Sequence, residues 1–577
     1  MKLVSALLFL LCVHPCLADS LYVNTTIYTV NPDLPQAHAL YVVDGKIAFV
    51  GSEEQARAQA SNETEVIDLH GRTMIPGFIE GHGHIMGLGL SKLNLDLMHV
   101  ANYEDLVEKV AVAVDSAEKG EWITGRGWHQ SKWVPQPGEM IKGFQTHTRL
   151  SEVSPDNPVY LVHASGHAGF VNAKAMEIAG ITKETEFSGD GEIIRDDKGE
   201  ATGVLNEIAQ SLVRKHVPPP SQAQRERALT LAMQELAENG VTSFQDAGSL
   251  RADVELYKQF LHEKKLTSRL WVMLSGRDYP HLLSSFGTSN PHFLSSWFKK
   301  GPEIDLGDGR LTIRAIKLVA DGALGSRGAW LLEPYLDRPG HVGLPTMSIE
   351  AMSDISHQAY QHGFQIGIHA IGDRANREVL NIFDRLFDGK DRGVRFRIEH
   401  AQHIAESDIP RFARLGVIAS VQGIHMSSDR LWAIDRLGIE RIKEGAYVWR
   451  KLVDSGAIMM NGTDAPVEPV NPIASFYSLV TRQTLKGEPE GGFEPEQKLS
   501  REEALISYTL AAAYGAFEED QKGSLEVGKW ADFTVLDRDI MKVPDAELLQ
   551  TAVLMTVVGG EVIFEKPRLE KLIGKKE

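Results

Sequence analysis

The sequence predicts an α/β protein: a (β/α)8 TIM barrel with a small composite β-sandwich domain, built from both chain ends, and a subdomain inserted between barrel strands 1 and 2. Apolar, β-rich runs alternate with amphipathic helical stretches through the middle of the chain, a pattern typical of parallel βα units. Eight such runs are present, the number that closes a TIM barrel. They lie at residues 74–79, 241–245, 269–274, 311–319, 365–368, 395–398, 417–421 and 457–460.

Residues 1–18 have the pattern of a secretory signal peptide. One lysine precedes an apolar run, and Cys16 and Ala18 are small residues suited to the positions before a cleavage site. We therefore expect export to the periplasm or out of the cell. A lipid anchor on Cys16 is a weaker interpretation, because His14 and Pro15 stand where such a motif has small or aliphatic residues.

The composition restricts both cofactor and partner. Both cysteines lie within the signal, so thiolate ligands and disulfides cannot enter the chemistry of the mature chain. A formal net charge of -18 argues against a basic face for nucleic acid or acidic membranes. No later segment is apolar over the ~20 residues that span a bilayer. We expect a small-molecule substrate, no nucleic acid and no membrane span, and homo-oligomer formation is left open.

Both ends of the chain have short strands joined by turns. We assign residues 19–73 and 523–577 to the composite β domain, in which Asp44-Gly45 between apolar runs is a hairpin signal. The two pieces bracket the barrel domain at 74–522.

One segment of the barrel domain, at about 85–240, far exceeds an ordinary βα crossover. It is expected to be an inserted subdomain near the rim of the active site.

Histidine and aspartate side chains follow four of the predicted barrel strands. His82 and His84 stand two residues apart at the end of the first strand, so both imidazoles point to the same face. Barrel enzymes keep their chemistry at the C-terminal ends of the strands, and imidazole and carboxylate groups bind divalent metals. Each group alone could merely cap a strand, but five together favour a metal site. The predicted ligands are His82, His84, His369, His400 and Asp464.

Lys317 is a charged residue inside the apolar run 311–319. A buried ammonium group is costly unless it is paired, deprotonated or modified. Two interpretations stay open. Lys317 either pairs with Asp321, or it is carboxylated by carbon dioxide and its carbamate oxygens bridge two cations.

These motifs, taken in order, resemble the amidohydrolase superfamily and in particular its amidohydrolase-3, YtcJ-like branch of metal-dependent hydrolases. The similarity runs from about residue 21 to 565. A departure from the pattern is Gln422-Gly423, where relatives often have proline after the glutamine. The motifs occupy residues 75–84, 317–328, 369–373, 399–400 and 464–469.

The resemblance implies a centre of two divalent metal ions, with zinc as the usual occupant and Lys317 as a carboxylated bridge. It also implies Asp464, Lys317 and His400 as catalytic residues, with Asp464 moving a proton from water to the leaving nitrogen. If His400 or His369 contacted the metal ligands without binding metal itself, the centre would hold one ion. One ion would bind His82, His84, Lys317 and Asp464, and the other would bind Lys317, His369 and His400.

Four side chains are candidate substrate contacts. His167 and Asn172 lie in a stretch of the insertion that matches the same branch. Trp128 has a spacing that suits a pocket wall or, equally, a core patch. His425 follows the seventh strand. Two other polar residues are assigned structural roles: His163 and Glu207.

The sequence thus predicts a metal-dependent hydrolase that cleaves a non-peptide C–N bond, such as the amide of an N-acyl or N-formyl amine, by a metal-activated hydroxide. A deaminase and a lactonase or esterase are alternatives, because the same hydroxide can attack an amidine or acyl carbon. A non-catalytic scaffold is disfavoured, because every ligand position of the motif is filled.

Overall fold

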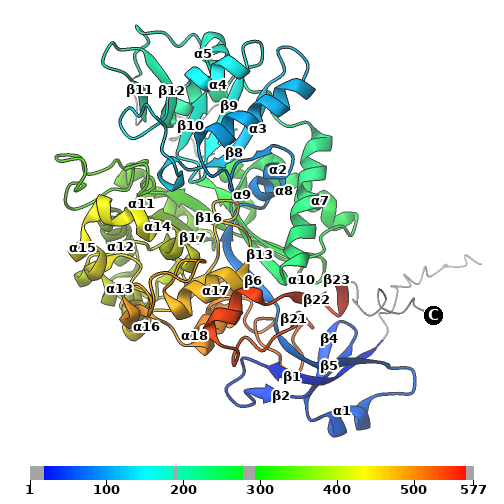
Figure 1. Cartoon of the computed structure of the whole chain (residues 1–577). Coiled ribbons are helices and arrows are strands. Elements are labelled where there is room, and N and C mark those ends of the chain that lie inside the picture. Colours follow the sequence, from blue (N-terminus) through cyan, green and yellow to red (C-terminus); the bar gives the residue numbers. More distant parts are fainter. Residues whose placement is uncertain (1–18, 188–190, 277–292, 567–577) are drawn as a thin grey trace, which may run out of the picture.

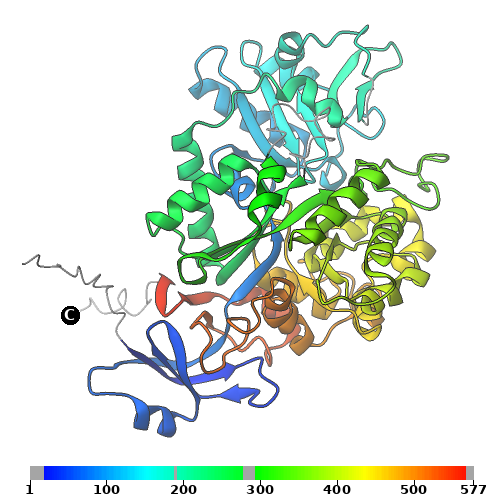
Figure 2. The same ribbon diagram turned by 180° about the vertical axis from the view of Figure 1, so that it is seen from behind.

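The computed structural model describes residues 19–187, 191–276 and 293–566. The predicted signal peptide at residues 1–18 lies outside them. Three sheets organise the described chain. In Figures 1 and 2 a sheet from the chain ends and a sheet from the insertion lie at opposite ends of the molecule, with the barrel between them. Within the described ranges, no helix is long and apolar enough to cross a membrane.

The middle sheet is a nearly closed barrel of eight parallel strands, as predicted. β6 and β20 approach each other across the seam: a Cβ atom added to Gly81 would lie 2.4 Å from the carbonyl oxygen of Asn461. A ninth strand, β15 (Glu303–Asp305), pairs antiparallel with β16. The hydrogen-bonded order is β6 (Phe78–Gly83), β13 (Val241–Ser249), β14 (Arg269–Ser275), β16 (Leu311–Val319), β17 (Gln365–Ala370), β18 (Arg397–His400), β19 (Ile418–Val421) and β20 (Met459–Asn461).

Helices cover the outside of the barrel because their apolar faces pack on its strands. In the first of them, Ser221 caps the N-terminus and its side chain accepts from the N–H of Gln224. From Ala228 to Ala237 adjacent pairs of residues are buried every four positions, which forms one apolar face. The main barrel helices are α7 (Gln222–Glu238), α8 (Arg251–His262), α9 (Phe293–Lys300), α11 (Ile349–Gln361), α12 (Asp373–Phe387), α13 (Ile409–Leu415), α14 (Gly423–Leu437), α16 (Trp449–Asp454), α17 (Pro472–Thr481), α18 (Arg501–Ser507) and α19 (Leu510–Gly515).

The first barrel strand begins later than the sequence indicated. Residues 74–76 belong to β5 (Glu65–Pro76) and pair with β21 (Phe533–Leu536), and β6 starts at Phe78. Gly77 marks the boundary, because a Cβ atom there would lie 2.2 Å from the side chain of Thr242. The chain passes from the terminal sheet into the barrel at this glycine.

The terminal sheet contains strands from both ends of the chain. Its strands form one sheet, where the sequence predicted a β-sandwich: seven lie on a single hydrogen-bonded path, and β2 pairs with β1 beside that path. The second layer on one face is helical instead: α1 (Glu53–Gln59) packs through Ala56 with Leu21 and Tyr41. The strands are β1 (Ser20–Tyr28), β2 (Gln36–Ala37), β3 (Ala39–Val43), β4 (Lys46–Gly51), β5, β21, β22 (Val553–Val558) and β23 (Glu561–Glu565).

The inserted subdomain is a six-stranded sheet with its own apolar core, and it is shorter than predicted. α2 (Ile85–Ser91) packs against α7 of the barrel layer, so the subdomain itself starts near residue 95 and its sheet ends at Glu207. Its strands are β7 (Leu95–Asp96), β8 (Ile123–Trp128), β9 (Val159–His163), β10 (Ala168–Val171), β11 (Gly191–Arg195) and β12 (Ala201–Glu207), and its longer helices are α3 (Tyr103–Ser116), α4 (Thr148–Val153) and α5 (Ala173–Ala179).

Candidate metal centre

A cleft of about 70 Å³ lies between the inserted subdomain and the C-terminal ends of the barrel strands. The barrel contributes His369, His400 and Asp464 to its wall, and the subdomain contributes His163 and His167. Three of the predicted ligands and two of the inserted-subdomain histidines therefore face one small space.

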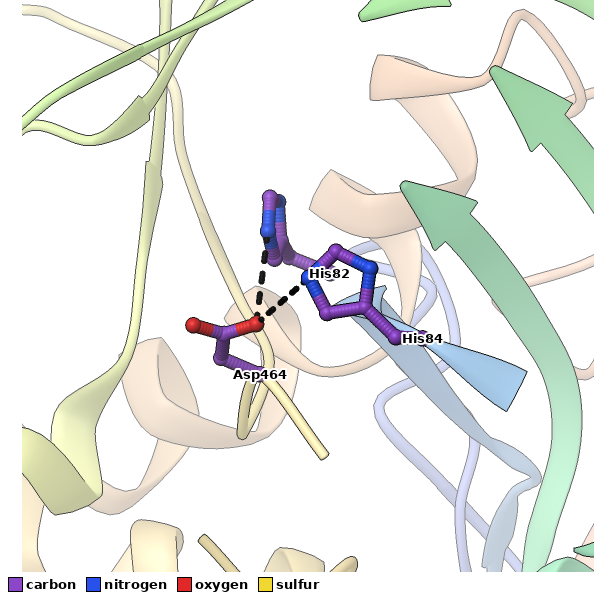
Figure 3. Close-up of side chains that lie close together, drawn as sticks. All are labelled: His82, His84 and Asp464. Atoms are coloured by element: carbon purple, nitrogen blue, oxygen red, sulfur yellow. Dashed lines mark ion pairs between the residues drawn. The ribbon is translucent and has the colours of Figure 1, made fainter. Parts of the chain in front are cut away.

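His82, His84 and Asp464 come together at the end of β6 and the loop after β20 (Figure 3). Their potential ligand atoms all lie within 4.8 Å of one another. The Asp464 Oδ1 atom is 3.6 Å from His82 Nε2 and 3.1 Å from His84 Nε2. Among the residues that the structure describes, this is the one group of three or more such side chains at metal-binding spacing.

His82 is oriented by a buried carboxylate. Its Nδ1 atom is 2.5 Å from Glu399 Oε2, and Glu399 is itself paired with Arg397 at 2.7 Å. Since a carboxylate can only accept, the proton stands on Nδ1 and the Nε2 lone pair is directed at the centre. Lys317 Nζ lies 3.2 Å from that Nε2 atom. The lysine thus reaches the centre from β16. Asp321 accepts from the backbone N–H groups of Trp330, Ile371 and Gly372.

His369 and His400 stand beside the first group, with ring centroids 4.4 Å apart. His400 Nδ1 is 2.7 Å from Gln422 Oε1, which fixes that ring in the same way. His369 Nε2 is buried without a hydrogen-bond partner, 3.4 Å from Asp321 Oδ1. A buried imidazole without a full set of partners is costly, and a nearby cation would offset this cost.

The protonation states suit a metal centre. Burial lowers the pKa of His82 to about 4, assisted by the charge of Lys317, and burial also holds the pKa values of His369 and His400 well below the usual range. Burial alone would raise the pKa of Asp464, but the hydrogen bond from His84 and the surrounding histidine charges outweigh it and hold that pKa well below its usual range. Neutral imidazoles and an ionised carboxylate are the forms that bind divalent cations.

The backbone at two of these residues is strained. His400 has φ of 75° and Asp464 has φ of 58°, in the left-handed region that non-glycine residues rarely adopt. Such conformations persist where the surroundings hold them, and they are concentrated at functional sites.

Two of the predicted substrate contacts do not line the cleft. Trp128 is fully buried in the core of the insertion, and its Nε1 atom donates to the Leu161 carbonyl at 2.9 Å. Asn172 caps α5, where its Oδ1 atom accepts from the Ala175 N–H at 2.9 Å. In the structure Trp128 has a packing role and Asn172 a capping role.

The other two candidates, His167 and His425, do line the cleft. His163, interpreted from sequence as structural, lines it as well, and its ring meets that of Trp128 edge to face, with 4.7 Å between centroids. Sequence reasoning also missed Glu399, although a visible signal was present. Arg397 and Glu399 stand two residues apart in a short buried strand, which places both charges on one face.

Comparisons with known proteins agree with this geometry. The family model described as "Amidohydrolase family" matches residues 65–564. The putative amidohydrolase YtcJ of Bacillus subtilis is 32% identical over 94% of this chain and 98% of the relative. An N-substituted formamide deformylase of Arthrobacter pascens is 28% identical over 95% and 98%. The crystal structure of an uncharacterized metal-dependent hydrolase from Pyrococcus horikoshii superposes with a TM-score of 0.71 at 28% identity, covering 92% of this chain and 99% of that one.

The protein has a nearly closed parallel barrel, and imidazoles and a carboxylate lie together at the ends of its strands. These two features define the class of barrel-fold, metal-dependent hydrolases. The chain belongs to the amidohydrolase family, in the YtcJ-like branch that its motifs predicted.

Proposed function

We propose that the chain hydrolyses the non-peptide amide bond of a small N-acyl or N-formyl amine at a centre of two divalent metal ions. The observation that carries this proposal is the meeting of His82, His84 and Asp464 within 4.8 Å, beside the buried rings of His369 and His400. Asp464, His369 and His400 also line the cleft. The likeness to a protein named N-substituted formamide deformylase supports a C–N bond as the target.

Divalent cations bound here would polarise a substrate carbonyl and activate water near neutral pH. Asp464, held as an anion, accepts a proton from the attacking water as the water oxygen bonds to the carbonyl carbon. The carboxyl group then returns this proton to the nitrogen as the C–N bond breaks, since an amine leaves readily only when it is protonated. The products are a carboxylic acid and an amine.

The side chains divide into two overlapping ligand sets, and their nitrogen and oxygen donors suit zinc. His82 and His400 are already oriented by Glu399 and Gln422. The first set is His82, His84, Lys317 and Asp464, and the second is Lys317, His369 and His400.

We propose further that Lys317 is carboxylated and bridges the two ions, which would supply the negative charge that neutral imidazoles lack. Its Nζ atom lies 3.2 Å from His82 Nε2, within the centre. Lys317→Arg cannot form a carbamate and is expected to lose metal and activity together, as measured by elemental analysis of the purified variant. Normal metal content in this variant would make the lysine a structural residue.

The proposed function is tested by elemental analysis of the purified protein combined with a screen of N-acyl and N-formyl amines. We expect close to two transition-metal ions per chain and release of a free amine. His84→Ala should lose metal and turnover together. Release of ammonia from a purine or pyrimidine with no amide cleaved would indicate a deaminase, and cleavage of lactones alone would indicate a lactonase.

The predicted signal peptide leads us to propose that the enzyme acts outside the cytoplasm. The intact mass of exported protein is then expected to correspond to a chain that begins near Asp19. An exported chain that retains Met1 would contradict this proposal.

A further inference from the structure

Three side chains of α14 lie on one face of that helix and line the cleft: His425, Asp429 and Trp432. They stand four and three residues apart, a spacing that brings side chains to the same side of a helix. The ring of His425 stacks with the ring of His400, with 6.3 Å between the centroids. Asp429 follows one helical turn later, about 6 Å along the helix axis. The metal centre and Asp429 therefore border different parts of one cleft.

A chain of buried hydrogen bonds holds the carboxylate of Asp429 in place. Gln402 Nε2 donates to the hydroxyl oxygen of Tyr447 at 3.0 Å, and this hydroxyl donates to Asp429 Oδ2 at 3.0 Å. Gln402 and Tyr447 are 4% and 1% exposed. The Tyr447 N–H also donates to the Gln402 carbonyl at 2.8 Å. Because the tyrosine oxygen receives the amide N–H, its own proton is directed at the carboxylate. The groups that fix Asp429 are thus neutral.

The negative charge of Asp429 has no cation of its own. In the part of the chain that the structure describes, its side chain contacts the Tyr447 hydroxyl and, at 3.5 Å, Ser428 Oγ, and it has no ion-pair partner. The charges of Lys132 and Glu468 both act on Asp429. Glu468 Oε1 itself lies 3.7 Å from Lys132 Nζ. Two carboxylates and one ammonium group therefore leave this part of the cleft wall with a net negative charge.

A carboxylate in this position is open to a ligand. Asp429 is partly exposed where it borders the cleft, and burial raises its pKa to about 6. A charge withdrawn from water is costly without a counter-ion, and a cation in the cleft would offset this cost. The cleft of about 70 Å³ is small, which suits a compact ammonium group better than a broad guanidinium.

We propose that Asp429 is a specificity-determining residue that binds a protonated amino group of the substrate, so that the preferred substrate is an N-acyl or N-formyl derivative of a diamine. The inference rests on the proposed function and names its substrate class. The ammonium group donates to Asp429 while the amide lies at the metal centre, and a short alkyl chain joins the two. A neutral chain of the same length would leave the carboxylate unpaired, and the enzyme would discriminate against it.

The experiment compares two probes of equal length, N-(4-aminobutyl)formamide and N-pentylformamide, which differ by an ammonium group in place of a methyl group. At about pH 8 the carboxyl group of Asp429 is ionised and an alkylammonium keeps its proton. The metal-loaded wild-type enzyme should favour the aminobutyl probe by about tenfold or more in kcat/KM. Asp429→Asn keeps the size of the side chain and an acceptor for Tyr447 but removes the charge. It should lower kcat/KM for the aminobutyl probe about tenfold and change the pentyl probe by less than about threefold.

Asp435→Asn is the matched control. Asp435 is an exposed residue of the same helix and is not among the described residues that line the cleft. This variant removes an equal charge outside the cleft, so the preference for the aminobutyl probe should stay within about twofold of the wild-type value. Elemental analysis of each variant ensures that rates are compared at equal metal content.

The wild-type preference is measured without any variant, so the inference stays testable even if Asp429→Asn fails to fold. Equal kcat/KM of the wild-type enzyme for the two probes, or an equal loss for both in Asp429→Asn, would overturn the inference while leaving amide hydrolysis intact. A metal-loaded wild-type enzyme that cleaves neither formamide would instead overturn the proposed function, and this inference with it.

Discussion

The carboxylate of Asp464 stands among three imidazoles, and it is suited both to bind a cation and to carry a proton. Burial opposes its charge, while the contact with His84 and the charges of His82 and His400 favour it. A carboxylate that only held metal would affect all substrates alike. One that also protonates the leaving group would matter most for amides, whose nitrogen departs poorly without a proton.

Asp464→Asn is therefore expected to lower kcat for an amide by roughly 10²–10⁴-fold, the usual contribution of a general acid or base. An activated ester, whose leaving group needs no proton, should retain a clearly larger fraction of its rate. The measurement is kcat for both substrates at equal metal occupancy. Equal losses would assign Asp464 to metal binding alone.

A second prediction at the residue scale concerns His163 and the pH dependence of stability. Burial lowers its pKa to about 3, and its Nδ1 atom accepts the N–H of Ser165 at 3.1 Å. Between pH 6.5 and pH 3 the unfolded chain binds a proton here and the folded chain does not, so stability falls as the pH falls through this range.

His163→Asn, whose Oδ1 atom can replace Nδ1 as acceptor, should reduce the slope of unfolding free energy against pH by about 1.4 kcal/mol per pH unit in this range. Denaturant unfolding at several pH values between 4 and 7 measures it. Parallel curves for variant and wild type would contradict the pKa assigned to His163.

At the scale of elements, strand ends were predictable and pairings between distant residues were not. His82, His369 and Asp464 could be assigned because each follows an apolar strand, and the C-terminal ends of parallel strands meet at one mouth. The contact of His82 with Glu399 joins residues 317 positions apart. No local pattern shows which carboxylate faces which ring, and a glutamate in a buried strand signals only that it has some partner.

The roles of residues in the insertion were also difficult to predict from sequence. Trp128 and Asn172 belong to motifs, and motifs mark folding requirements as well as substrate contacts. Trp128 fills the core of the insertion and Asn172 caps a helix, whereas His163 and Glu207, which look unremarkable in sequence, approach the cleft through the packing of the subdomain on the barrel. Contacts between the insertion and the barrel depend on how their surfaces pack together, and the residue pattern of a single strand does not encode this packing.

The seam between β6 and β20 provides a prediction at this scale. A methyl group at Gly81 would lie 2.4 Å from the carbonyl oxygen of Asn461, next to His82 of the proposed metal centre. Gly81→Ala should destabilise the protein by about 1–3 kcal/mol, the usual cost of overpacking, and should reduce metal content. Thermal unfolding and elemental analysis measure both.

Gly138→Ala is the control for the seam, since nothing lies within 4 Å of a Cβ atom there. It should change neither stability nor metal content appreciably. If Gly81→Ala behaved like this control, the two strands would be less closely packed than the structure indicates.

At the scale of the whole molecule, stability and chemistry are placed at opposite ends. The insertion and the strand ends form the cleft, while the terminal sheet packs beneath the barrel (Figure 1). This division is general for barrels, whose N-terminal face serves stability. The connections of the barrel explain why both chain ends contribute to one sheet. The chain enters the barrel domain directly from β5, and after the barrel it returns in β21, which pairs with β5.

One of the contacts that join the terminal sheet to the barrel is a buried ion pair. Arg269, at the start of β14, donates from Nε to Asp532 Oδ2 at 2.6 Å and from Nη2 to Oδ1 at 3.0 Å, and Asp532 also accepts from the Gly559 N–H at 2.7 Å. Their side chains are 2% and 3% exposed, so neither charge can be solvated if its partner is lost. The ring of Trp530 covers the guanidinium at 4.6 Å.

Asp532→Leu and Arg269→Met are each expected to cost about 3–5 kcal/mol of unfolding free energy, because each leaves a buried charge unpaired. The double variant should cost clearly less than the sum of the two, since it leaves no charge behind. Because the pair lies far from the cleft, variants that fold should keep the wild-type metal content and the wild-type rate per bound metal. Additive losses in the double-variant cycle would show that the two charges act independently. A fall in rate per metal would show that the terminal sheet influences the centre itself.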